Sequence, residues 1–201
     1  MTIADLPAET LIGLFVFAVA SSVTPGPNNM MVAASGANFG FRRTLPNLIG
    51  IELGFATLAV LVGLGAGAFL AAFPEVERTL RFVAVAYLLY LSWRIATAGR
   101  AGPGERTRPL TVTEAALFQF VNPKAWAMAL TANAAFLFPE LGPLGQGLVV
   151  AAVFVAVGIP SVAMWAGFGT AIGRFLRTDA ALRVFNVTLG LLTAGSAVFM
   201  L

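Results

Sequence analysis

The stretch TPGPNN, residues 24–29, interrupts the first long apolar segment of the chain, residues 6–41. Each proline removes a backbone hydrogen-bond donor and clashes with the carbonyl group four residues before it, so two prolines flanking Gly26 cannot lie in a regular helix. Lipid cannot satisfy the freed carbonyl groups, which must therefore face protein, water or a ligand. The stretch predicts two half-helices that meet at a break.

A second interruption, VNPK at residues 121–124, lies near the middle of another apolar segment, residues 112–138. After each break a new half-helix begins, and its free N–H groups and positive dipole end suit an anion such as a carboxylate. A simple proline kink is the alternative at either position. Matched breaks of this kind indicate a transport site at the middle of the bilayer.

The composition excludes most other classes of protein. Of 201 residues, 59% are hydrophobic and 10% are charged, whereas soluble domains have about 45–50% apolar and about 25% charged residues. A soluble enzyme, a nucleic-acid-binding domain and a disordered chain are therefore excluded. The chain contains no Cys and no His, so thiolate metal sites and the usual proton shuttle are absent. We expect no metal, no cofactor and no enzymatic activity.

Six apolar segments are each at least as long as the roughly 20 residues that cross a bilayer. They predict an all-α integral membrane protein with six transmembrane helices. Because three is odd, two sets of three helices have opposite orientations, and this gives two inverted repeats with broken helices 1 and 4. Residues 1–98 form the first repeat, residues 99–111 a cytoplasmic linker and residues 112–201 the second repeat. The segments cover residues 6–41, 44–72, 75–98, 112–138, 144–172 and 181–201.

The basic residues predict the orientation. Nine of the 12 lie in alternate loops on one side, two lie on the other side, and Lys124 lies within a segment. The side with nine is expected to face the cytoplasm. Both termini are then outside the cytoplasm.

Two charged residues lie in the interior of the apolar segments, away from their ends: Glu52 and Lys124. A charge at the centre of a bilayer costs about 2.5–3.5 kcal/mol on insertion scales, so such residues usually face a cavity and have a partner. Lys124 is a candidate to bind a carboxylate, and Glu52 to hold an ammonium group or accept a proton. The alternatives are that Lys124 extends to the interface, that Glu52 reaches interfacial water, or that the two form a direct pair.

For the asparagines at the breaks and for the paired glycines, the sequence allows two interpretations each. Asn28 and Asn122 lie at the breaks, where they either bind ligand or cap freed backbone groups. Glycine pairs four residues apart predict close helix packing inside one bundle, with the face of a homodimer as the alternative. These pairs are Gly36 and Gly40, Gly50 and Gly54, Gly63 and Gly67, and Gly169 and Gly173.

Over nearly its whole length the chain resembles the LysE/RhtB family of amino-acid exporters. The strongest similarity is TPGPNN, followed by Ala34-Ser35-Gly36 and Gly40-Phe41-Arg42-Arg43, and FQFVNPKA at residues 118–125 resembles the second signature of the family. The resemblance implies export of amino acids or close derivatives across a bacterial inner membrane, driven by protons, with neutral amino acids favoured. The implied partners are an amino acid, protons and membrane lipid.

The candidate substrate site combines both breaks, and Glu52 is the candidate for proton coupling. Two other functions are the alternatives to amino-acid export. A divalent-metal exporter would need His, Cys or clustered carboxylates, and a non-transporting scaffold gives no reason for matched breaks. The candidate substrate-binding residues are Pro25, Gly26, Pro27, Asn28, Asn29, Asn122, Pro123 and Lys124.

Overall fold

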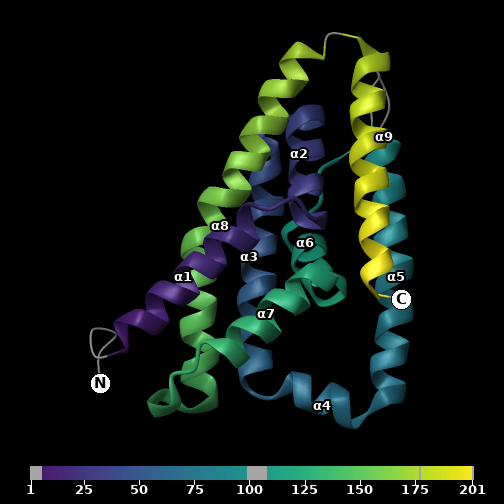
Figure 1. Ribbon diagram of the computed structural model, residues 1–201. Helices are drawn as coiled ribbons and strands as arrows, with labels where there is room; N and C mark the ends of the chain where they lie inside the picture. Colours follow the sequence, from purple (N-terminus) through teal and green to yellow (C-terminus); the bar gives the residue numbers. More distant parts are fainter. Residues whose placement is uncertain (1–5, 99–107, 177, 201) are drawn as a thin grey trace.

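The structure describes residues 6–98, 108–176 and 178–200, which form helices joined by short connections (Figure 1). The structure is a computed structural model. In chain order its elements are α1 (Ala8–Val23), α2 (Pro27–Phe39), α3 (Phe41–Gly63), α4 (Ala66–Ala72), α5 (Pro74–Ala96), α6 (Val112–Phe118), the 3-10 turn η2 (Gln119–Val121), α7 (Pro123–Ala135), η3 (Pro139–Leu141), α8 (Gly142–Phe175), α9 (Asp179–Gly195) and η4 (Ser196–Met200).

Four helical units are long and apolar enough to cross a membrane: α3, α5, α8 with the preceding η3, and α9. The helices α1 and α2 form a fifth such unit when they are counted together, because only a short break with a bend of 50° separates them. The predicted fourth span is divided into the seven residues of α6, the turn η2 and the 13 residues of α7. The described residues therefore contain four or five candidate spans, where the sequence predicted six.

Two other segments differ in length from the prediction. The predicted second span, residues 44–72, is divided at Gly65, whose φ of +105° favours glycine. After this turn α4 has no buried residue and lies across one end of the bundle (Figure 1). By contrast, the 34 residues of α8 extend about 51 Å at 1.5 Å per residue. That exceeds a hydrocarbon core of about 30 Å, and α8 is inclined in Figure 1.

The helix α8 packs on α1, α2 and α3, while α6 packs on α3 and α5 packs on α9. Glycines permit the closest of these approaches: an added Cβ at Gly169 would meet the carbonyl oxygen of Ala33, and one at Gly50 would meet that of Val112. The predicted packing inside one bundle is thus confirmed for these glycines, whereas Gly40 instead ends α2 with φ +83°. Within the predicted pairs, the glycines whose added Cβ would meet another helix of the same chain are Gly36, Gly50, Gly54, Gly63, Gly67, Gly169 and Gly173.

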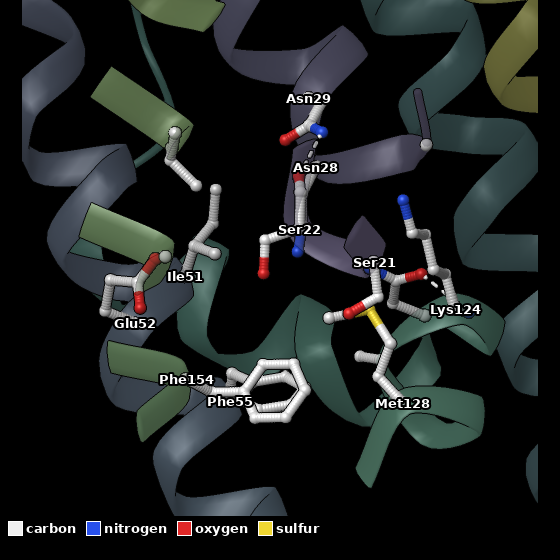
Figure 2. Close-up of a pocket in the computed structure, with 15 residues that line it drawn as sticks. Ser21, Ser22, Asn28, Asn29, Ile51, Glu52, Phe55, Lys124, Met128 and Phe154 are labelled. Carbon is white, nitrogen blue, oxygen red and sulfur yellow. Dashed lines mark hydrogen bonds between the residues drawn. The ribbon is translucent and has the colours of Figure 1, made fainter. Parts of the chain in front are cut away.

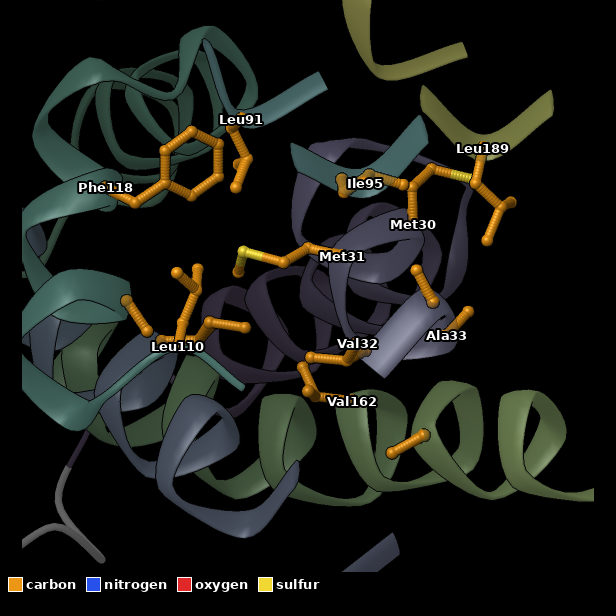
Figure 3. Close-up of a cluster of buried hydrophobic side chains, with 14 of the residues drawn as sticks. Met30, Met31, Val32, Ala33, Leu91, Ile95, Leu110, Phe118, Val162 and Leu189 are labelled. Atoms are coloured by element: carbon orange, nitrogen blue, oxygen red, sulfur yellow. The ribbon is translucent and has the colours of Figure 1, made fainter. Parts of the chain in front are cut away.

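The apolar core consists of two clusters with a polar level between them. Along α3 the first cluster ends at Ile51 and the second begins at Phe55. Along α8 the second cluster ends at Val157, and the first begins again at Val162. Glu52 lies in this interval on α3. Figure 3 shows the first cluster, which joins α2, α3, α5, α6, α8 and α9.

Candidate functional site

The first break is formed as the sequence predicted. α1 ends at Val23, Gly26 precedes α2 in an extended conformation, and Pro27 is the first residue of α2. A proline is well placed there, because the first N–H of a helix has no partner within the helix. The chain therefore changes direction by 50°, and neither Pro25 nor Pro27 lies in the interior of a helix.

Side chains satisfy the carbonyl groups that the break leaves free at the end of α1. Asn29 Nδ2 donates to the carbonyl oxygens of Ser22 and Thr24, at 2.8 Å each. Trp165 Nε1 of α8 donates to the carbonyl oxygen of Val23 at 3.1 Å. A buried carbonyl needs such a partner. In this structure Asn29 is therefore a backbone cap, although its side chain also lines the cavity described below.

The second break has a similar construction. After the turn η2, Asn122 adopts an extended conformation and Pro123 is the first residue of α7. Asn122 Oδ1 accepts a hydrogen bond from Lys124 N at 3.1 Å, and its side chain is buried. Of the two roles that the sequence left open for Asn122, capping is the one that this structure contains.

Lys124 connects the two breaks directly. Its Nζ donates to the carbonyl oxygen of Thr24 at 2.7 Å, to Thr24 Oγ1 at 2.9 Å and to the carbonyl oxygen of Pro25 at 3.3 Å. Gly26 makes room for this side chain, because an added Cβ would lie 2.6 Å from Lys124 Cδ. The ammonium group thus lies at the negative end of α1 and is held there by protein groups.

A pair of amides forms a second connection between the breaks. Asn28 Nδ2 donates to Gln119 Oε1 at 2.8 Å, and Gln119 Nε2 donates to Asn28 Oδ1 at 3.0 Å. These residues lie 91 positions apart in the chain. The prediction that the two breaks lie together is confirmed by this pair and by Lys124.

A small cavity of about 50 Å³ lies between the breaks (Figure 2). That volume holds a few water molecules at most. Pro25, Pro27 and Pro123 are absent from its lining: they shape the helix ends, and Pro123 faces a different cavity next to α4 and α5. The predicted residues that do line it are Gly26, Asn28, Asn29, Glu52, Asn122 and Lys124.

Glu52 and Lys124 lie on opposite walls of this cavity (Figure 2). The direct pair between them that the sequence left open is not formed, and Glu52 has no hydrogen bond or ion pair within the described part of the chain. Gly158 of α8 makes room for the carboxylate, because an added Cβ would lie 2.5 and 2.6 Å from its two oxygens. The cavity therefore presents one acidic and one basic group that do not neutralise each other by contact.

Several lining residues were not predicted from the sequence. Ser21 and Ser22 lie within a turn of the first break, so their nearness to TPGPNN was the signal that could have identified them. Phe55 and Phe154 close one end of the cavity with rings 4.8 Å apart. Nothing in the sequence separates these two from other apolar positions. The additional lining residues are Ser21, Ser22, Ile51, Phe55, Ala125, Met128, Phe154, Gly158 and Val162.

The cavity has the chemistry of a polar binding site rather than of a metal centre. Within residues 6–98, 108–176 and 178–200, no three His, Cys, Asp or Glu side chains come together as metal ligands. The polar groups that line the cavity are amides, hydroxyls, one carboxylate and one amine. Such a set matches a small organic ligand with both donors and acceptors.

Curated relatives match over almost the whole chain. The cysteine/O-acetylserine efflux protein of Escherichia coli (strain K12) is 30% identical over 191 residues, which are 94% of this chain and 96% of the relative. The protein of the same name from Salmonella typhimurium (strain LT2) is 29% identical over 188 residues, 94% of this chain and 95% of the relative. No solved structure matches.

The family comparison agrees with the resemblance that TPGPNN and VNPK carry. Residues 19–201 match the model of the family described as LysE type translocator. That range contains both breaks and every residue that lines the central cavity. Its members are translocators and not enzymes. The chain belongs to the family of LysE type translocators.

Proposed function

We propose that this protein exports neutral amino acids or their close derivatives from the cytoplasm, with cysteine and O-acetylserine as the first substrates to test. The observation that carries the proposal is the central cavity, whose walls hold Glu52 and Lys124 without a contact between them. A zwitterion brings one carboxylate and one ammonium group and so matches both charges. The names of the relatives, cysteine/O-acetylserine efflux proteins, support the choice of substrate.

Lys124 and Glu52 together indicate how the substrate is oriented. In this structure the Lys124 ammonium group donates to the carbonyl oxygens of Thr24 and Pro25, at the negative end of α1. We propose that an arriving amino acid places its own ammonium group near Glu52, on the opposite wall. Lys124 then leaves the two carbonyls and pairs with the substrate carboxylate, together with N–H groups at the start of α2.

The cavity of about 50 Å³ is too small for an amino acid, so the structure corresponds to a closed state in this scheme. Opening requires α1 and α2 to move relative to α6 and α7. We propose that the chain forms six spans in two inverted repeats, with α6 and α7 as a broken fourth span, and that rocking of the repeats exposes the site alternately.

Glu52 is the candidate for proton coupling. It is buried at the polar level between the two apolar clusters and has no bonded partner there among the described residues. A carboxylate in this position attracts the substrate's ammonium group, and protonation from outside removes that attraction. Substrate then leaves as a proton enters, which is proton antiport.

The basic residues support the proposed orientation in a bacterial inner membrane. The C-terminal end of α5, the C-terminal end of α2 and α9 meet through Asn186, which donates to the carbonyl oxygen of Ala98 and pairs with Asn38. The basic residues of the predicted cytoplasmic side that the structure describes, among them Arg42 at the start of α3 and Arg94 near the end of α5, belong to this end of the bundle. We propose that this end faces the cytoplasm, with both termini outside and the helices surrounded by lipid.

Transport by purified protein in proteoliposomes tests the proposal. Wild-type protein is expected to carry labelled O-acetyl-L-serine, and the Lys124→Ala and Pro27→Ala variants to carry it at least tenfold more slowly, because ion pairs and helix-end geometry each contribute about 1–3 kcal/mol to binding. Arg183→Ala, which removes an exposed charge outside the cavity, is the matched control. Undiminished transport by both Lys124→Ala and Pro27→Ala would overturn the proposed site.

A further inference from the structure

A second cavity, of about 290 Å³, lies between α2, α3, α5 and residues 108–110. It adjoins the central cavity along two helices. On α2, Asn28 lines the central cavity and Met31 lines the second; on α3, Ile51 lines the central cavity and Asn47 the second. Three or four helical residues rise about 4.5–6 Å, so one turn of helix separates the two cavities.

Asn47, in the wall of the second cavity, lacks the partners that a buried amide requires. Its side chain has no exposed surface, and neither its Nδ2 nor its Oδ1 has a hydrogen-bond partner. Among the described residues it is the one amide side chain with both polar atoms buried and unpartnered. Leaving such a group unpaired destabilises a fold. Because the amide has no exposed surface in this structure, a ligand in the second cavity reaches it only when neighbouring side chains move.

The charges around this cavity favour an anionic group. Arg94 and Arg108 line it, and among the described lining residues there is no Asp or Glu. Glu114, which lies outside the lining, accepts two short hydrogen bonds from Arg108, at 2.6 and 2.8 Å. Its distance to Arg94 is 3.8 Å, so the guanidinium of Arg94 keeps donors free for a second carboxylate.

Apolar side chains separate the two cavities. Met31 and Ile51 belong to the same buried cluster, and Figure 3 shows Met31 directed toward Leu91 and Phe118. A methionine side chain is unbranched and adaptable. Met31 can therefore change its rotamer without a change in the backbone, and we include such a change in the proposed passage between the cavities.

We propose that the second cavity is a cytoplasmic subsite that holds the amino acid before it reaches the centre. Arg94 binds the carboxylate, and the Asn47 amide binds the polar groups of the same molecule. The inference rests on the proposed export function and on the orientation that the basic residues predict. The volume of about 290 Å³ is at the lower end of the roughly 300–1,000 Å³ of ligand sites, as expected for a small substrate.

Asn47→Leu tests the subsite, because leucine has a similar shape and removes only the amide. In inside-out membrane vesicles, which present the cytoplasmic face, the KM for O-acetyl-L-serine is expected to rise about tenfold with an unchanged maximal rate. Arg94→Gln is expected to act in the same direction. Ser161→Ala is the control, because it removes a different buried and unpartnered group, a hydroxyl that lines neither cavity. This variant is expected to leave the KM unchanged.

If Asn47 has only a structural role, the variants are expected to behave differently. Thermal stability would stay the same or rise in Asn47→Leu, since an unpartnered buried amide is lost, and the KM would not move. An unchanged KM in both Asn47→Leu and Arg94→Gln, with normal transport by wild type, would overturn the subsite and leave the export function standing. Failure of wild-type vesicles to transport either cysteine or O-acetylserine would overturn both.

Discussion

Replacing Gly158 with alanine probes how the fold accommodates Glu52. The added Cβ would lie 2.5 and 2.6 Å from the two carboxylate oxygens, closer than real Cβ contacts come. The carboxylate must therefore move, and overpacking of this kind costs about 1–3 kcal/mol. Alanine also favours a helix over glycine by about 0.5–1 kcal/mol. The net change is a loss of up to about 2.5 kcal/mol of unfolding free energy.

The effect of Gly158→Ala on stability is expected to change sign when the carboxylate is removed. In a Glu52→Ala background the clash is absent, so Gly158→Ala should stabilise the protein by about 0.5–1 kcal/mol. In a Glu52→Gln background the side chain keeps its size, and Gly158→Ala should again destabilise. The cycle thus predicts a coupling energy of about 1–3 kcal/mol between positions 52 and 158.

Thermal unfolding of the detergent-purified proteins, followed by tryptophan fluorescence, measures this cycle. For a chain of 201 residues, each kcal/mol shifts the Tm by about 2–4 °C. An equal shift for Gly158→Ala in the wild-type, Glu52→Ala and Glu52→Gln backgrounds would refute the reasoning. The carboxylate would then not lie against Gly158.

Three further substitutions probe the central cavity and the helix packing. Gly26→Ala should displace Lys124, since the new Cβ would lie 2.6 Å from its Cδ, and should lower the transport rate at least tenfold in proteoliposomes. Gly169→Ala should reduce the yield of folded protein on size-exclusion chromatography, because the new Cβ would meet the rigid carbonyl oxygen of Ala33 at a cost of about 3 kcal/mol or more. Glu52→Gln should make transport insensitive to an imposed pH gradient, because the amide cannot carry a proton.

Matched glycines provide the controls. Added Cβ atoms at Gly195 and Gly167 would meet nothing within 4 Å, so alanine at these positions should preserve transport and folded yield. Wild-type transport by Gly26→Ala would contradict the contact with Lys124, and a normal yield of Gly169→Ala would contradict the close approach of α8 to α2. A response of Glu52→Gln to the pH gradient equal to that of wild type would remove Glu52 from the coupling scheme.

The two breaks were predictable because their cause is local. Proline removes a donor wherever it stands, so TPGPNN and VNPK alone indicated where helices must end. The meeting of the breaks followed from matched positions in the two halves. The number of continuous helices did not follow, because hydropathy cannot distinguish a seven-residue helix such as α6 from part of a span. The same reason explains why the turn at Gly65 was missed.

The details of the site depend on contacts that hydropathy and spacing do not encode. The sequence could not show that Asn122 caps α7 or that Asn29 holds the carbonyls of α1, because both roles require the fold. Gly158 leaves space for the Glu52 carboxylate, although the two residues are 106 positions apart in the chain. This contact likewise depends on how α3 packs on α8. Asn47 carried no signal at all, since its unpartnered amide is a property of the folded state.

The central claim is that the two breaks meet, and cross-linking tests it most directly. The chain has no cysteine, so Asn28→Cys with Gln119→Cys introduces one defined pair, and a protease site in the linker, residues 99–111, lets a gel report whether the halves remain joined. Asn38→Cys with Asn186→Cys, a second hydrogen-bonded pair across the linker, is the positive control. Asn28→Cys with the exposed Thr188→Cys is the negative control.

In native membranes treated with a short bifunctional thiol reagent, the Asn28–Gln119 pair is expected to give one uncut band after proteolysis, as the positive control does. Two separate fragments from this pair, under conditions that join the Asn38–Asn186 pair, would show that the breaks lie apart. That result would contradict the shared cavity on which the proposed transport site depends.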